Sequence, residues 1–340
     1  MEPQLFSTRL TEMFEVPHPI AAGGMMWLST AGFIAAVARG GAMGFMTPRS
    51  YGAPEAFREG LAECIALADG NPVGVNLTIP RYHATSAPNR EYLAIALDQG
   101  VRMFETAGAH PGDLIEAIHA GGGRVMHKAT QFRHALAAER DGADAVVIVG
   151  MEAGGHPGLN PHPAPVLLAH LRPKLRVPLA IGGGMGTGRQ LAGMLAMGAE
   201  AVLMGTRFLT AAQIWAHPDY KARLVAATHD DTTTAMESIK ATWRVLDNAT
   251  AREIRRMEAE GDPRFEDFGA VVRGTYGRDN AYMRGDAEKG LLSCSSAVGF
   301  AQGVEPAEAI VASIIAEARE ALGRLDALRV APADAAVSAA

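Results

Sequence analysis

The chain has 340 residues, of which 48% are hydrophobic and 20% are charged, and its formal net charge is -6. This composition is typical of a globular protein, and the length suffices for a barrel-sized domain with an additional module. The acidic balance and the lack of a long basic run argue against nucleic acid or a membrane surface as a partner. No stretch approaches the roughly 18 apolar residues of a membrane helix.

The chain has two cysteines, Cys64 and Cys294, which is too few for a disulfide scaffold or a cysteine-rich metal site. Together with the lack of an apolar leader in residues 1–10, this favours a reducing, cytoplasmic location.

Eight short apolar segments alternate with segments that have helical spacing. Strands alternating with helices predict an α/β fold with a parallel sheet. Eight units fit a closed (β/α)8 barrel, a TIM barrel, better than a doubly wound sheet, because the glycine clusters come late in the chain. The predicted strands are residues 19–23, 42–46, 73–77, 101–105, 124–126, 145–149, 178–181 and 201–204.

The strand signals become rare after Leu209. We predict a barrel over 1–214, a mostly helical module over 215–303 that covers the substrate, and a returning barrel helix over 304–330. The alanine-rich residues 331–340 are expected to form a flexible tail.

A loop with four glycines and one histidine, residues 150–158, follows the strand predicted at 145–149. Its His156 can take or give a proton near neutral pH. Alone, the loop could equally be an ordinary connection with a surface histidine. In a barrel, however, the loops after the strands share the face on which active sites lie. His156 is therefore the candidate catalytic residue.

The loops after the seventh and eighth predicted strands are glycine-rich, at residues 182–186 and at Gly205-Thr206. These two loops commonly bind phosphate in such barrels. Backbone amides that glycines expose at the start of a helix suit a phosphate dianion. Two glycine sites at both expected positions favour phosphate binding over simple tight turns.

Polar side chains end other predicted strands. Asn76 could hydrogen-bond a planar heterocycle, and Lys128 could stabilise negative charge in the barrel mouth. A turn-forming asparagine and a snorkelling surface lysine are the alternatives. Residues 25–27, Met-Met-Trp, would give an apolar wall or simply pack in the core.

Other chemistries have weaker signals. Glu152, His156 and His162 lie close in sequence, but their spacing fits no regular ligand frame, so no metal site is expected. Neither cysteine follows a strand end, and a G-x-S-x-G elbow is absent.

At these positions the chain resembles the nitronate monooxygenase family, formerly called 2-nitropropane dioxygenases. The resemblance covers nearly the whole chain, and its motifs are specific only in combination. They are His18-Pro19-Ile20, Gly23-Gly24-Met25, Gly74-Val75-Asn76-Leu77, His127-Lys128, Glu152-Ala153-Gly154-Gly155-His156-Pro157-Gly158, Gly182-Gly183-Gly184 and Met204-Gly205-Thr206-Arg207-Phe208.

The resemblance implies a non-covalently bound FMN and an active-site histidine, His156. It implies that the phosphate lies on one set of residues, Gly183, Gly184, Gly205 and Thr206. It also implies that the flavin ring is contacted or lined by Gly23, Gly24, Met25, Asn76 and Lys128, with Gly154 and Gly155 in the adjacent motif.

The activity that the resemblance implies is oxidation of alkyl nitronates with oxygen to a carbonyl compound and nitrite. An NADH:quinone reductase of the same fold, with NADH as co-substrate, is the alternative, and residues 23–27 look most like that branch. The loop at 78–89 could then gate access of the nicotinamide. An enoyl-acyl-carrier-protein reductase and a flavin-binding module without turnover also stay open. The expected partner is a small-molecule substrate, a nitronate or a quinone, and a homodimer is compatible with the sequence.

Overall fold

The computed structural model describes residues 4–79, 87–159 and 161–329. Its centre is a closed barrel of eight parallel strands in sequence order, in which β8 pairs with β1. The predicted (β/α)8 barrel is therefore confirmed. The strands are β1 (Ile20–Ala22), β2 (Met43–Met46), β3 (Gly74–Ile79), β4 (Met103–Gly108), β5 (Arg124–Ala129), β6 (Ala145–Val149), β7 (Leu179–Gly182) and β8 (Ala201–Met204).

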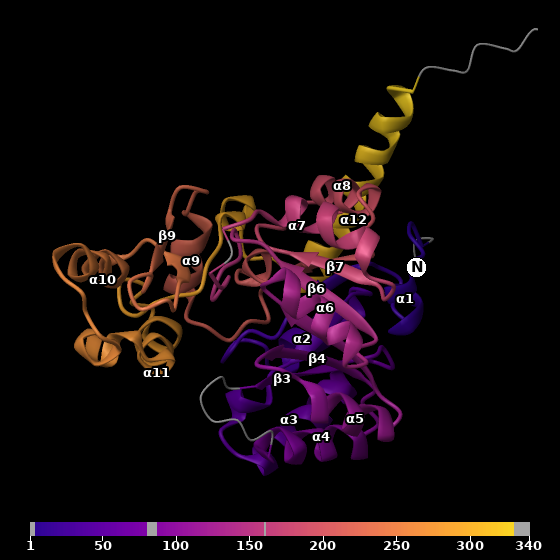
Figure 1. Cartoon of the computed structure of the whole chain (residues 1–340), viewed down its shortest axis with the longest axis horizontal. Helices are drawn as coiled ribbons and strands as arrows, with labels where there is room; N and C mark the ends of the chain where they lie inside the picture. Colours follow the sequence, from indigo (N-terminus) through magenta and orange to yellow (C-terminus); the bar gives the residue numbers. More distant parts are fainter. Residues whose placement is uncertain (1–3, 80–86, 160, 330–340) are drawn as a thin grey trace, which may run out of the picture.

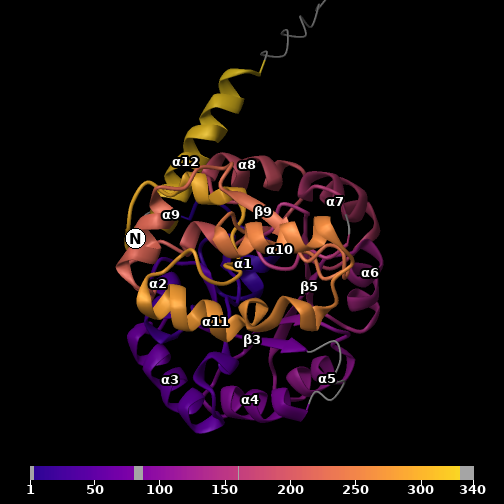
Figure 2. The same cartoon turned by 90° about the vertical axis from the view of Figure 1, so that its left-hand side faces the viewer.

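A ring of helices surrounds the barrel (Figure 1). The last of them, α12 (Ala307–Ala327), packs against α8 and α2 and closes the ring. Its carboxyl-terminal end projects beyond the barrel in both views (Figures 1 and 2). The other outer helices are α2 (Ala31–Arg39), α3 (Pro54–Leu67), α4 (Ala87–Asp98), α5 (Gly112–Ala120), α6 (Phe132–Arg140), α7 (Ala164–Leu171) and α8 (Gly188–Ala196).

Side chains alternate between the two faces of each strand, so one set fills the barrel and the other packs under the helices. The inner set is apolar at the amino end of the barrel, where α1 (Arg9–Met13) closes it. Leu10 and Phe14 join this inner cluster, and Phe14 meets Phe45 edge-on with ring centroids 6.3 Å apart. Because this end is sealed, a ligand site has to lie at the carboxyl end.

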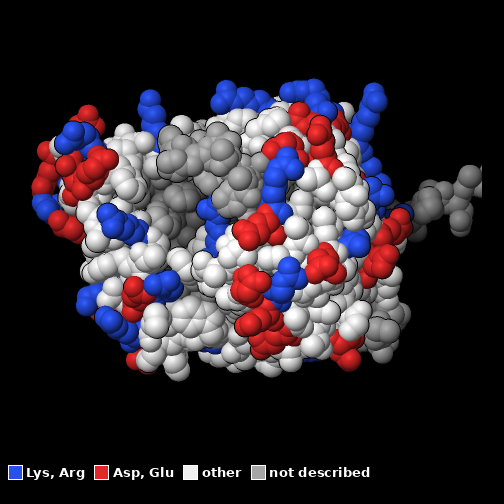
Figure 3. Space-filling view, turned by 90° about the horizontal axis from the view of Figure 1, so that it is seen from below, with Lys and Arg blue, Asp and Glu red and all other residues white. Residues whose placement is uncertain are grey.

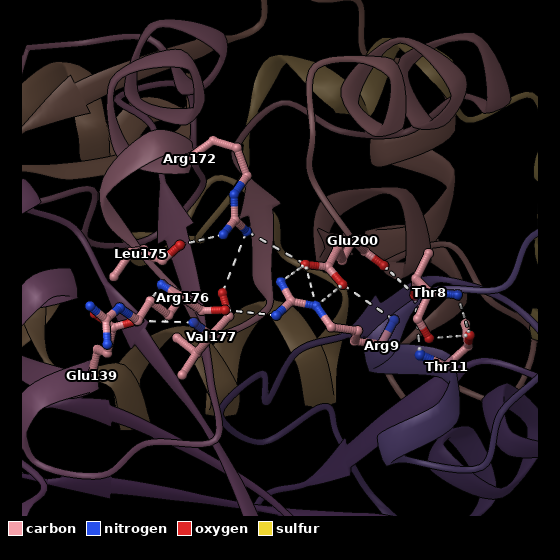
Figure 4. Close-up of polar contacts among 9 residues, drawn as sticks. All are labelled: Thr8, Arg9, Thr11, Glu139, Arg172, Leu175, Arg176, Val177 and Glu200. Atoms are coloured by element: carbon pink, nitrogen blue, oxygen red, sulfur yellow. Dashed lines mark hydrogen bonds and ion pairs between the residues drawn. The ribbon is translucent and has the colours of Figure 1, made fainter.

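A polar network fastens α1 to the loops that precede β7 and β8 (Figure 4). Arg9 pairs with the carboxylate of Glu200 and donates to the carbonyl of Arg176 at 2.7 Å. The hydroxyl of Thr8 donates to the carbonyl of Glu200 at 2.8 Å. The network stabilises the amino end and takes no part in the carboxyl-end face.

A module between β8 and α12 covers the carboxyl-end face (Figure 2). Its contacts with the barrel loops include the pairing of Gly155 with Arg244. The indole of Trp215 also donates to the carbonyl of Trp27, and the amide of Ser295 donates to Thr206. Its helices and turns are α9 (Pro218–Val225), α10 (Ala249–Glu260), η4 (Phe265–Val272), α11 (Gly274–Gly277), η5 (Arg278–Tyr282) and η6 (Ser296–Phe300).

The module also contains an antiparallel hairpin that the sequence analysis missed. It consists of β9 (Thr232–Ala235) and β10 (Trp243–Leu246). The three threonines of β9 gave no apolar strand signal, because this strand is only half buried. The hairpin matters for function because β10 contacts the loop that carries His156.

Two expectations fall outside the described residues. Most of the loop at 78–89 and the whole tail at 331–340 lie there. In the part of the chain that is described, each helix is too short or too polar to cross a bilayer.

The contact between α8 and α12 predicts a large stability effect at Gly188. A Cβ there would lie 2.0 Å from the carbonyl oxygen of Ile314 and 2.3 Å from the amide of Ala318. Because backbone atoms cannot move aside cheaply, Gly188→Ala should lower the free energy of unfolding by about 3 kcal/mol. Gly193→Ala on the same helix meets nothing within 4 Å and should raise it by about 0.5–1 kcal/mol. Urea unfolding of both variants checks this, and equal midpoints would contradict the packing described.

Candidate active site

Three polar side chains point into the barrel at its carboxyl end. Asn76 on β3, Glu105 on β4 and Lys128 on β5 occupy inward positions, since their neighbours Val75, Phe104 and Ala129 pack outward. The sequence analysis ended β5 at residue 126, which is wrong. The strand continues to Ala129 because Lys128 pairs with Ala107 on one side and Val147 on the other. Lys128 therefore lies on a strand and faces the barrel mouth, and it is not part of a loop.

The carboxylate of Glu105 joins these side chains. One oxygen accepts a hydrogen bond from the Asn76 amide nitrogen and from the Gly24 amide at 3.0 Å. The other oxygen pairs with the Lys128 ammonium at 3.0 Å. The Glu105 side chain is fully buried, whereas that of Lys128 is 20% exposed. The ammonium of Lys128 thus reaches the mouth, and the buried carboxylate of Glu105 balances its charge.

The loop after β1 crosses this cluster. A Cβ on Gly24 would lie 2.5 Å from Cβ and Cγ of Asn76, so only glycine fits. A Cβ on Gly23 would lie 3.1 Å from Leu203. Met25 reaches the β8 loop, with its sulfur 3.7 Å from the Cβ position of Gly205. The cluster therefore brings together most of the residues predicted to line a ring.

The two predicted phosphate loops lie side by side, after the paired strands β7 and β8. Gly183 and Gly184 have φ of 110° and 64°, a region of backbone conformation that favours glycine. Gly205 precedes the short helix η3 (Thr206–Phe208). The hydroxyl of Thr206 accepts hydrogen bonds from the amide and hydroxyl of Ser295, both at 3.0 Å. Two adjacent glycine-containing loops of this kind are suited to an anion.

His156 is exposed on the loop after β6 and is held from the module side. Its Nδ1 lies 3.3 Å from the carbonyl oxygen of Thr242. Its ring stacks on Trp243 with centroids 4.6 Å apart and planes at 38°. The Trp243 indole in turn donates to the hydroxyl of Ser293 at 2.8 Å. Thr242 and Trp243, the first residue of β10, therefore help to orient the candidate catalytic ring.

Gly154 and Gly155 of the same loop serve the contact with the module. A Cβ on Gly154 would lie 2.8 Å from the backbone carbon of Cys294 and 2.9 Å from the amide of Ser295. Gly155 has φ of 85° and exchanges two backbone hydrogen bonds with Arg244. Close backbone approach therefore accounts for both glycines.

Sequence reasoning missed Glu105, Thr242 and Trp243. It recognised Trp27 only as part of an apolar wall. This residue has φ of 69°, a region that large side chains rarely adopt, and the guanidinium of Arg278 lies 4.6 Å from its ring centroid. The alternation of Trp243, Arg244, Val245 and Leu246 was the available signal for β10.

A family model for nitronate monooxygenase matches residues 7–317. The chain belongs to the nitronate monooxygenase family.

Proteins similar to this family member differ in the activities for which they are named. A nitronate monooxygenase of Neurospora crassa is 26% identical, with 94% of each chain covered. A hydroxy-methyl-oxo-octahydroindene-carboxyl-CoA dehydrogenase of Rhodococcus jostii is 26% identical over 95% of this chain and 98% of that protein. The structure of FabK from Thermotoga maritima superposes with a TM-score of 0.84 at 30% identity, covering 95% of this chain and 99% of the other. As a member of the nitronate monooxygenase family, the protein is a flavin-dependent oxidoreductase.

Covalent catalysis by cysteine does not suit this family member. Burial raises the pKa of both thiols, Cys64 and Cys294, to about 12, so neither is a thiolate at neutral pH. Within the described residues, no group of three histidine, cysteine, aspartate or glutamate side chains could hold a metal ion.

His127, the neighbour of Lys128, predicts a pH effect on stability. It is buried on the outer face of β5, and its Nδ1 shares a 2.9 Å hydrogen bond with the hydroxyl of Thr106. Burial lowers the pKa of His127 to about 4, helped by nearby positive charges. The unfolded chain, with a pKa near 6.5, therefore binds a proton between these values that the folded chain does not, and stability falls with falling pH.

Replacing His127 with Gln should remove about 2 kcal/mol of the loss in free energy of unfolding between pH 7 and pH 4.5. Urea unfolding at the two pH values measures it. The exposed His170→Gln on α7 is the control and should keep the wild-type difference. An unchanged pH dependence in His127→Gln would show that this residue is not the group responsible.

Proposed function

We propose that this protein is an FMN-dependent nitronate monooxygenase that oxidises alkyl nitronates with oxygen to a carbonyl compound and nitrite. The observation that carries the proposal is the position of His156. It lies on the loop after β6, at the carboxyl end of the barrel, and its ring contacts Thr242 and Trp243 of the module. The proposal agrees with the family to which the chain belongs.

FMN fits the residues present. When bound, it supplies the electron-accepting ring, and the protein supplies binding, orientation and electrostatics. Because the Thr206 hydroxyl accepts both bonds from Ser295, its own hydrogen can be donated to a phosphate oxygen. We assign the phosphate to Gly183, Gly184, Gly205 and Thr206, and the ring to Gly23, Gly24, Met25, Asn76 and Lys128, with Gly154 and Gly155 at its border.

The tautomer of His156 follows from its partner. A carbonyl oxygen only accepts, so Nδ1 carries the hydrogen in the bond to Thr242. The neutral ring therefore has its lone pair on Nε2. That atom can remove the α-proton of a neutral nitroalkane, and the protonated ring can hold the anionic nitro group of a nitronate.

The substrate would enter between the module and the barrel. Figure 3 shows lysine and arginine side chains interspersed with aspartate and glutamate side chains on both parts of this face. We accordingly propose that residues 215–303 act as a substrate-covering module on a barrel formed by residues 1–214 and 304–330.

A second candidate is reduction or oxidation of an acyl-CoA thioester. This candidate is favoured by the similarity of the chain to the carboxyl-CoA dehydrogenase of Rhodococcus jostii, which aligns over nearly the full length of both proteins. An NADH:quinone reductase is the remaining alternative, and it requires that NADH reduce the flavin.

The test is made on purified protein. We expect a yellow protein that releases FMN on denaturation, identified by mass, and that consumes oxygen and forms nitrite with propyl-2-nitronate. NADH with benzoquinone and NADH with an enoyl-CoA are run in parallel. If no nitrite forms while one of the NADH reactions proceeds, the nitronate assignment is overturned. A colourless protein would overturn the flavin assignment.

A further inference from the structure

Three donors from three different elements converge on one buried carboxylate. Glu105 accepts from the amide of Gly24, from the side chain of Asn76 and from the ammonium of Lys128. Asn76 is held on its other side as well, because its Oδ1 accepts from the Thr78 hydroxyl at 2.8 Å. Each donor belongs to a segment that faces the proposed flavin ring.

The position of Glu105 in the sheet explains the convergence. Glu105 pairs with Asn76 across β3 and β4, and Lys128 lies on the next strand at an inward position. The carboxylate is fully buried, and a buried charge has to be paired or hydrogen-bonded to persist. Because Lys128 is the cation in contact with Glu105, the pair as a whole is neutral.

We propose that Glu105 is a positioning residue that holds Lys128, Asn76 and the Gly24 amide against the flavin and cancels the charge of Lys128. This inference rests on the proposed flavin binding. Without the carboxylate, the ammonium would present a full positive charge to the ring. The pair therefore sets the reduction potential of the flavin, since a nearby positive charge stabilises the negative charge of the reduced ring.

The experiment compares flavin midpoint potentials of the wild type, Glu105→Gln, Lys128→Met and the double variant. Glu105→Gln leaves the ammonium unbalanced and should raise the potential. Lys128→Met leaves the carboxylate unbalanced and should lower it. The double variant is neutral, like the wild type, and should return close to the wild-type value. A role in packing alone would not give opposite signs for two single variants that break one contact.

Glu200→Gln is the matched control. Glu200 is a carboxylate paired with Arg9, but it lies at the sealed amino end of the barrel (Figure 4). Its loss should lower the urea midpoint and leave the potential unchanged. Equal potentials in all variants, or shifts of the same sign in both single variants, would overturn the proposal.

A measurement without flavin keeps the two proposals separable. Urea midpoints of the flavin-free proteins should be non-additive, the double variant being more stable than the two single losses together imply. If Glu105→Gln fails to fold, the flavin midpoint potentials of Lys128→Met and of the double variant can still be compared with that of the wild type. Additive midpoints would contradict the pairing, whereas a protein that never binds flavin would contradict only the proposed cofactor.

Discussion

His156→Ala is expected to keep its flavin and to lose about 100- to 10,000-fold in turnover with nitro substrates. The ring stands on the loop after β6 at the open end of the barrel, and Thr242 and Trp243 fix it from the module. A methyl group in its place can neither accept the α-proton nor bind the anionic nitro group. Because the proposed phosphate loops follow β7 and β8, cofactor binding should be unaffected.

Nitrite formation and flavin content of the purified variant measure the two parts of this result. His170→Ala is the control, since His170 is exposed in the last turn of α7, the helix that follows the same loop. It should match the wild type in both assays. Wild-type turnover in His156→Ala would remove this residue from the reaction.

Gly24→Ala should weaken flavin binding by roughly 10- to 100-fold, which corresponds to about 1–3 kcal/mol of overpacking. The new Cβ would lie 2.5 Å from Cβ and Cγ of Asn76. Asn76 or the loop after β1 has to move, and the bond from the Gly24 amide to Glu105 is then lost. Both changes disturb the residues against which the flavin ring is proposed to lie.

Fluorescence titration of the flavin-free protein with FMN gives the affinity. The control is Gly32→Ala on α2, where a Cβ meets nothing within 4 Å. This variant should bind FMN as the wild type does and be about 0.5–1 kcal/mol more stable. If Gly24→Ala binds FMN with wild-type affinity, the ring does not lie against this cluster.

The barrel could be predicted because its strands are short apolar runs in regular alternation with helices. The strand predicted at 145–149 and that predicted at 201–204 coincide with β6 and β8. The ends of β4 and β5 could not be predicted from apolarity. They continue to Gly108 and Ala129, and their inward residues beyond Phe104 and Met126 include Glu105 and Lys128. Polar side chains at a barrel mouth look like the start of a loop.

The loops of the candidate site could be predicted from the sequence, whereas the residues that hold the site residues in place were missed. Glu105 was recognised as the last residue of a strand, but its role depends on pairing with Asn76 on β3 and Lys128 on β5, which is a property of the sheet register. The hairpin of β9 and β10 was missed because its strands are short and mostly half buried. Its contact with Gly155 joins segments about ninety residues apart, which no local pattern encodes.

Anaerobic reduction of the purified protein, followed at the flavin absorbance band, tests the central claim most directly. Propyl-2-nitronate and NADH are mixed with separate samples in parallel. We expect rapid bleaching by the nitronate and none by NADH. Rapid bleaching by NADH with no response to the nitronate would contradict the account and assign the protein to the reductases of its fold.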